Sequence, residues 1–148
     1  MIIITLLLFG LYFPSIHYSQ IDISPNFFLI SILIFSVYNN DYKIILLGFF
    51  FGLINDILLS TYYHGLLTII FTFFSYLLFR ANIYKNRTLI NPLNITLLYL
   101  TIFLLYITRY EDSYFFYIIF SSINTFLSFI ILILFDNFYD ISKKYAKK

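Results

Sequence analysis

Charged residues divide this chain into long apolar blocks, and this division constrains the fold more than any other feature of the sequence. A helix needs about 20 mostly apolar residues to cross the hydrocarbon core of a bilayer, so each block has room for at least one membrane-spanning helix. The blocks lie at 1–21, 23–40, 44–79, 88–108 and 113–135. The third block has room for two helices, because the polar segment Ser60–His64 in its middle ends at Gly65 and is typical of a tight turn. The sequence therefore predicts six membrane-spanning helices.

Composition indicates the same class of protein. Hydrophobic residues make up 61% of the chain and charged residues only 11%, and the mean hydropathy is +0.91. Water-soluble domains are about half apolar and about a quarter charged. We therefore expect an all-α integral membrane protein whose 148 residues form a single transmembrane domain. The absence of cysteine excludes disulfides, thiolate metal ligands and thiol catalysis.

Helix boundaries follow from the charges, the prolines and the turn residues. The expected helices lie at 2–18, 25–39, 43–59, 64–80, 90–108 and 114–136. Pro14 should kink or end the first helix, because it removes a backbone donor. Ser24 and Pro25 supply a start for the second helix, with serine as the cap and proline in the first turn, and Asn91 and Pro92 do the same for the fifth.

The basic residues predict the orientation in the membrane, because cytoplasmic segments are enriched in Lys and Arg. With six helices, eight of the nine basic residues fall on the same side of the membrane. They lie between the second and third helices, between the fourth and fifth, and after the sixth. They are Lys43, Arg80, Lys85, Arg87, Lys143, Lys144, Lys147 and Lys148. We therefore expect both termini in the cytoplasm (N-in/C-in).

Asp56 is the only charged residue inside the apolar blocks. Placing such a residue in a membrane helix costs roughly 2.5–3.5 kcal/mol, so it usually faces protein and has a function. Gly48, Gly52 and Asp56 follow each other at intervals of four and share one helix face, with Asn55 beside them. A G-x-x-x-G pair lets another helix approach closely. The face therefore predicts helix packing, either against a neighbour in this chain or against a partner protein.

Three roles are open for Asp56. Its carboxylate can accept hydrogen bonds from backbone amides just past Gly65, where the start of the next helix favours an anion, and so fix the hairpin. It can take part in a proton or ion relay, or it can be recognised by a partner. A relay normally needs a second titratable group at depth, and no other expected helix provides one. The sequence favours the structural role, and it shows no catalytic, cofactor or metal-binding motif.

The order of features from Ile21 to Arg80 resembles the bacterial rod shape-determining membrane protein family MreD. That family has a proline and a polar residue at the start of its second helix, then two glycines at a spacing of four, an aspartate four residues later, and a glycine after the turn. The matching residues here are Pro25, Asn26, Gly48, Gly52, Asp56 and Gly65. The family usually has aspartate at the position of Asn26, and its turn after the aspartate is shorter and contains glycine.

The resemblance implies a function without catalysis, cofactor or nucleic acid. MreD-like proteins are multi-pass scaffolds of the cell-elongation complex in the bacterial cytoplasmic membrane. They associate with the membrane-anchored protein MreC, and through it with the glycosyltransferase and transpeptidase that extend peptidoglycan and with the actin-like MreB. Apart from membrane lipids, an MreC-like protein is thus the expected direct partner.

The resemblance also supplies a rival, since the family fold is similar to the six-helix substrate-binding subunits of energy-coupling-factor vitamin transporters. Such a subunit commonly carries an A-x-x-x-A pattern in its first helix, and the first expected helix here has no alanine. An intramembrane enzyme is a third class. It would need several polar or charged side chains at one depth, and Asp56 stands alone.

Overall fold

The computed structural model is helical except for two strands of three residues each. It describes residues 16–18, 21–39, 41–59, 65–84, 89–110 and 113–146, with side chains at 24–39, 41–58, 65–81, 89–110 and 113–137. The elements are β1 (Ile16–Tyr18), β2 (Ile21–Ile23), α2 (Phe27–Tyr38), α3 (Lys43–Leu59), α4 (Leu66–Tyr84), α5 (Pro92–Arg109) and α6 (Tyr114–Ala146). The predicted helical class is confirmed for these residues.

Five of the six expected helices correspond to α2–α6. The bounds of α3 are those expected, and α6 continues ten residues beyond the expected end at 136, to Ala146. The first expected helix, 2–18, lies outside the described residues except for its last three. Those three form β1, which pairs antiparallel with β2 in the register Ile16↔Ile23, so the prediction of helix at 16–18 is wrong. β-branched isoleucine favours a strand, and Pro14 cannot donate a hydrogen bond to a helix in this region.

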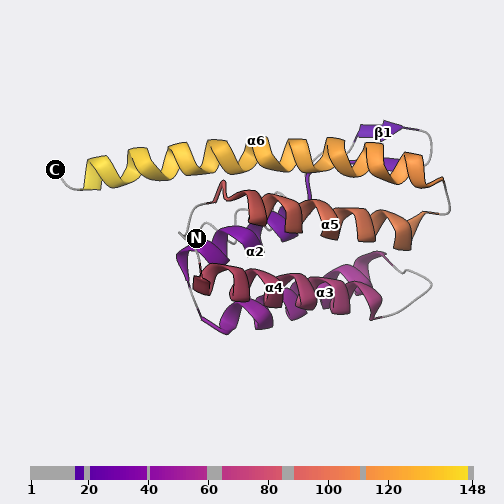
Figure 1. Ribbon diagram of the computed structural model, residues 1–148, viewed down its shortest axis with the longest axis horizontal. Helices are drawn as coiled ribbons and strands as arrows, with labels where there is room; N and C mark the ends of the chain where they lie inside the picture. The colour runs from indigo at the N-terminus through magenta and orange to yellow at the C-terminus, as the bar shows by residue number, and fades with distance from the viewer. Residues whose placement is uncertain are drawn as a thin grey trace.

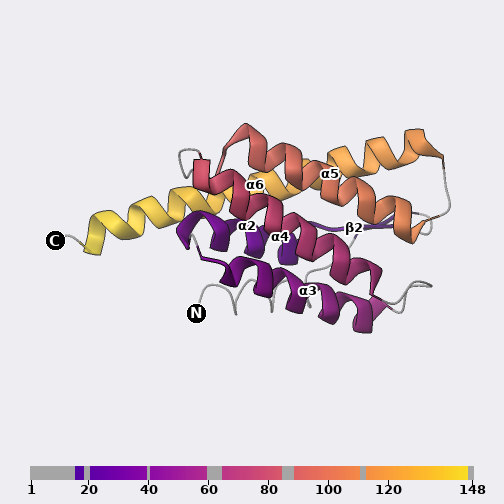
Figure 2. The ribbon, with the colours of Figure 1, turned by 60° about the horizontal axis from the view of Figure 1, so that its bottom comes forward.

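The helices form an elongated bundle in which α3, α4, α5 and α6 run in alternating directions (Figure 1). The most extensive packing joins α3 to α4, and α5 packs against both α4 and α6. The starts of α3 and α5 and the end of α6 lie at one end of the bundle, while the predicted turn Ser60–His64 lies outside the described residues. The 33 residues of α6 rise about 50 Å, and its last turns project beyond the other helices (Figure 2).

The start of α2 differs from the expectation. Its N-cap is Asn26, whose Oδ1 accepts a hydrogen bond from the Leu29 amide at 3.2 Å, so the predicted Ser24 cap is wrong. The first helical hydrogen bond runs from the Ile30 amide to the Asn26 carbonyl at 3.0 Å, so Ser24 and Pro25 both precede the helix. The corresponding prediction for α5 is confirmed, because Asn91 is its N-cap and Pro92 its first residue.

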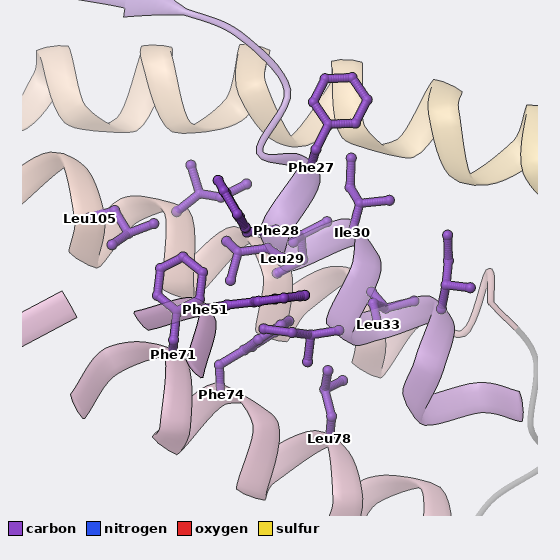
Figure 3. Close-up of a cluster of buried hydrophobic side chains, with 14 of the residues drawn as sticks. Phe27, Phe28, Leu29, Ile30, Leu33, Phe51, Phe71, Phe74, Leu78 and Leu105 are labelled. Carbon is purple, nitrogen blue, oxygen red and sulfur yellow. The ribbon is translucent and has the colours of Figure 1, made fainter. Parts of the chain in front are cut away.

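Helix α2 lies inside the bundle and contributes a large part of its hydrophobic core. Ten of its 12 residues are buried, among them Leu29, Ile30 and Leu33. Side chains from α3, α4 and α5 converge on it, and the ring of Phe28 meets that of Phe51 edge-on with centroids 5.5 Å apart (Figure 3). A helix that is apolar on every side is stable only when it is surrounded, and here its neighbours surround it.

The outer helices differ from those of water-soluble proteins in their outward faces, although large apolar side chains such as Phe71 and Phe74 also lie inward. Their outward faces carry many large apolar side chains, including Phe49, Phe50, Ile57, Ile69, Phe73, Leu100, Phe115, Phe126 and Leu134. Their inward faces carry polar ones, including Asn55, Asp56, Thr68, Ser75, Asn94, Thr101, Ser121, Asn124 and Ser128. The surface is therefore apolar and part of the interior is polar.

Two described stretches are long and apolar enough to cross a membrane. They are Pro92–Arg109, which is α5, and Tyr114–Asn137 within α6. By contrast, the 12 residues of α2 rise about 18 Å, less than the ~30 Å of a hydrocarbon core. Six membrane crossings therefore stay a prediction.

Candidate functional site

Asp56 lies on α3 with its carboxylate at the start of α4. The residue is only 7% exposed. Its Oδ1 accepts a hydrogen bond from the Leu67 amide at 3.2 Å, and its Oδ2 accepts one from the Thr68 amide at 2.9 Å and another from the Thr68 hydroxyl. The hydrogen bonds predicted between this carboxylate and the amides past Gly65 are therefore present.

These bonds replace a helix cap that α4 cannot make for itself. The Gly65 carbonyl accepts the first helical hydrogen bond, from Ile69 at 3.1 Å, which makes Gly65 the N-cap residue. An N-cap side chain normally binds the amides two and three residues on, but glycine has no side chain. Those two amides belong to Leu67 and Thr68, and Asp56 of the neighbouring helix binds both. A negative charge at this position also complements the positive end of the α4 dipole.

The glycine pair on α3 packs against α4 of the same chain. A Cβ added to Gly52 would overlap the Cα of Thr68, and one added to Gly48 would overlap the Ser75 hydroxyl and lie 2.7 Å from the carbonyl oxygen of Phe71. Real Cβ atoms do not approach backbone atoms so closely. The sequence left open whether a helix of this chain or a partner protein packs on the glycine face. In the structure α4 of this chain packs there, so Gly48 and Gly52 are not accessible to a partner.

The other residues singled out in the sequence have local contacts. Asn55 is buried, and its Nδ2 donates to the Phe51 carbonyl of its own helix at 2.9 Å. Pro25 is buried beside Asn26, which caps α2. Gly65 has a φ of 90°, a conformation that L-residues rarely adopt, so this position is suited to glycine.

This arrangement fixes Asp56 and leaves its oxygens occupied. Its hydrogen-bond partners are two backbone amides and one hydroxyl, and none of these groups titrates near neutral pH. In the described part of the chain, no group of three or more His, Asp or Glu residues could hold a metal ion. The geometry supports the structural role of Asp56, and the hydrogen bonds described for its carboxylate involve no second titratable side chain.

A second set of buried polar side chains, on α5 and α6, was not predicted from the sequence. Its buried members are Asn94 and Thr101 on α5 and Ser121, Asn124, Thr125 and Ser128 on α6. Tyr106 of α5 also takes part, because its Oη accepts a hydrogen bond from Asn124 Nδ2 at 3.3 Å. The α6 residues recur at intervals of three and four inside an apolar block, and this periodicity is visible in the sequence.

No model of a known protein family, no curated protein and no solved structure matches this chain. Its function is therefore inferred from its own residues and geometry.

Proposed function

We propose that this chain is a multi-pass protein of the bacterial cytoplasmic membrane that serves as a non-catalytic scaffold of the cell-elongation complex. Its direct partner is an MreC-like membrane protein, through which it is connected to the peptidoglycan synthases and to actin-like MreB. The observation that carries the proposal is the engagement of Asp56, the residue that most suggested chemistry, in holding α3 against α4. A rigid helical body with an apolar exterior is what a membrane scaffold requires.

The apolar outward faces of the outer helices support the membrane location. Water-soluble monomers rarely expose contiguous apolar patches larger than a few hundred Å². Here large apolar residues cover the outward faces of α3 to α6, with Ile57 78% exposed and Phe115 73% exposed. Lipid tails in contact with these faces remove them from water, while Asp56 with Thr68 and Asn124 with Tyr106 form hydrogen bonds between helices in the interior.

The covered glycine face limits where the partner can bind. Because α4 packs on Gly48 and Gly52, a partner helix has to contact an outward face. Each outer helix offers a large exposed side chain there. These are Phe50 on α3, Phe73 on α4, Leu104 on α5 and Phe126 on α6. These positions are suitable for mapping the contact.

The test is photo-crosslinking in rod-shaped bacterial cells that depend on this protein and produce an MreC-like protein. A photoreactive amino acid replaces Phe50, Phe73, Leu104 or Phe126 in turn, and adducts are identified by mass spectrometry. We expect adducts with the MreC-like protein from one face and lipid adducts from the others. The inward position Phe74, which is 1% exposed, is the control and should give neither.

Two results would contradict the proposal. One is the absence of an MreC-like adduct from every outward face while depletion of the protein leaves the cells rod-shaped. The other is co-purification with transporter ATPases, which would favour the vitamin-transporter class.

A further inference from the structure

Among the described residues, the buried serine and threonine hydroxyls follow one rule with two exceptions. Six buried Ser and Thr side chains donate to a carbonyl of their own helix or to Asp56: Ser31, Ser36, Thr68, Ser75, Thr101 and Thr125. Ser121 and Ser128 do not, and each is fully buried with an unpartnered Oγ. Both exceptions lie on α6.

Asn124 lies between the two serines and also has a buried polar atom without a hydrogen-bond partner. Its Nδ2 donates to Tyr106, but its Oδ1 is buried without a partner, and the residue is 7% exposed. Positions 121, 124 and 128 are three and four residues apart and so lie on one face of α6. Three unpartnered polar groups therefore meet within two turns of one helix, in the interior of the bundle.

Leaving such groups without partners is costly, and a serine can avoid the cost by rotating toward its own helix, as Ser31, Ser36 and Ser75 do. We propose that Ser121, Asn124 and Ser128 form a binding site for two ordered water molecules. The site contains hydroxyl and amide groups and no charge, which suits a neutral ligand. Its complete burial suits one no larger than water.

The spacing on α6 fits one water in each gap. Ser121 and Asn124 are separated along the axis by about 4.5 Å, and Asn124 and Ser128 by about 6 Å, so a water in either gap reaches both neighbours. Each serine hydroxyl donates to one water, and both waters donate to Asn124 Oδ1, which has two lone pairs. Each water then has at least the two polar partners that a buried water requires.

The site lies at the level where α2 begins. The rings of Tyr38 and Phe135 are in contact, with centroids 6.5 Å apart, and α2 and α6 run in the same direction (Figure 1). Counting eleven residues back from each places Phe27, the first residue of α2, near the level of Asn124. Non-helical backbone deep in a bundle needs polar groups or water nearby, and this site supplies both.

The direct test is water-edited solid-state NMR on the full chain in lipid bilayers. Magnetisation from water should reach the Cβ of Ser121 and Ser128 and the side chain of Asn124. Ser36, which is equally buried but bonded to the Leu33 carbonyl, is the control and should receive little. Transfer no greater than that to Ser36, or an organic molecule bound in place of water, would overturn the proposal.

Alanine substitution gives a second, independent readout. If the hydroxyls hold water, Ser121→Ala and Ser128→Ala should each lower the Tm in detergent by about 2–4 °C. If they are simply unpartnered, removing them should leave the Tm unchanged or raise it, which would contradict the site. Ser122→Ala is the matched control, since that exposed hydroxyl bonds to the Ile118 carbonyl of its own helix.

Discussion

The helix pairs α3–α4 and α5–α6 are both antiparallel and both contain small or polar residues at their contact, but they are held together differently. In the first pair, glycines bring the backbones together and Asp56 binds two amides and a hydroxyl of α4. In the second, Asn124 makes one bond to Tyr106, and the polar groups of Ser121 and Ser128 have no described protein partner.

This difference shows two ways for helices to associate when apolar residues also cover the outside. Apolar side chains are then equally stable inside and outside the bundle, so apolar contact alone does not hold the helices together. Close packing and hydrogen bonds must stabilise their association. The α3–α4 contact is complete within the protein and should be rigid. At the α5–α6 contact, Ser121 and Ser128 have no described protein partner, and we propose that water binds them. Substitutions there should therefore have smaller and more solvent-dependent effects on stability.

Gly52→Leu should have the largest effect, because a side chain at this position overlaps the backbone of Thr68. Overpacking typically costs about 1–3 kcal/mol, and a clash with backbone should reach or exceed the top of that range. Circular dichroism during thermal unfolding in detergent measures the change. Ile54→Leu, at an exposed position of the same helix, is the control and should be near neutral. Equal stability of the two variants would contradict the packing described for α3 and α4.

Asp56→Ala should lower the free energy of unfolding by about 3 kcal/mol, since it leaves the buried donors of Leu67 and Thr68 without an acceptor. Asp56→Asn keeps one acceptor oxygen and should lose less. The same unfolding assay checks this order. A variant with alanine that is as stable as the parent would show that the cap contributes nothing.

Gly65→Ala tests the N-cap position of α4, whose next amides are bound by Asp56. An L-residue at φ 90° is strained by about 1–2 kcal/mol, although the added Cβ meets no atom within 4 Å. The loss should therefore come from the backbone alone. Comparing Gly65→Ala with Gly65→Asn separates the two causes, because asparagine tolerates positive φ better and should recover part of the loss.

Tyr106→Phe should have the smallest effect, about 1 kcal/mol, because it removes the neutral hydrogen bond that Asn124 Nδ2 donates to the Tyr106 hydroxyl. Tyr99→Phe is the control on the same helix, where the ring stacks on Phe103. A loss as large as that of Asp56→Ala would erase the contrast between the two helix pairs.

Much of the helical layout could be predicted from the sequence, because charges and turn residues interrupt the apolar blocks at helix ends. The bounds of α3 and the cap and proline of α5 are examples. The start of α2 could not be predicted, since Ser24 and Asn26 are both good N-cap residues and the sequence does not decide between them. The end of α6 was also missed, because its last turns are polar and project beyond the bundle.

The binding of Asp56 to amides of the next helix could be predicted because only a short turn separates Asp56 from Gly65. The two glycines on the same helix face also indicated close helix packing there. The occupant of that face could not be predicted, because a glycine pair accepts any helix. The α5–α6 cluster consists of serine, threonine and asparagine, which commonly bond to their own helix, so the residue types alone gave no indication of unpartnered groups.

A double-mutant cycle tests most directly the claim that a side chain of α3 caps α4. Asp56→Ala and Thr68→Val are made singly and together, and the free energies of unfolding are compared. We predict a coupling energy of about 1–3 kcal/mol, because the Thr68 hydroxyl donates to Asp56. The control pair Asp56→Ala and Thr72→Val should show none, since Thr72 bonds to the Thr68 carbonyl of its own helix. Additive effects of Asp56→Ala and Thr68→Val would contradict the account.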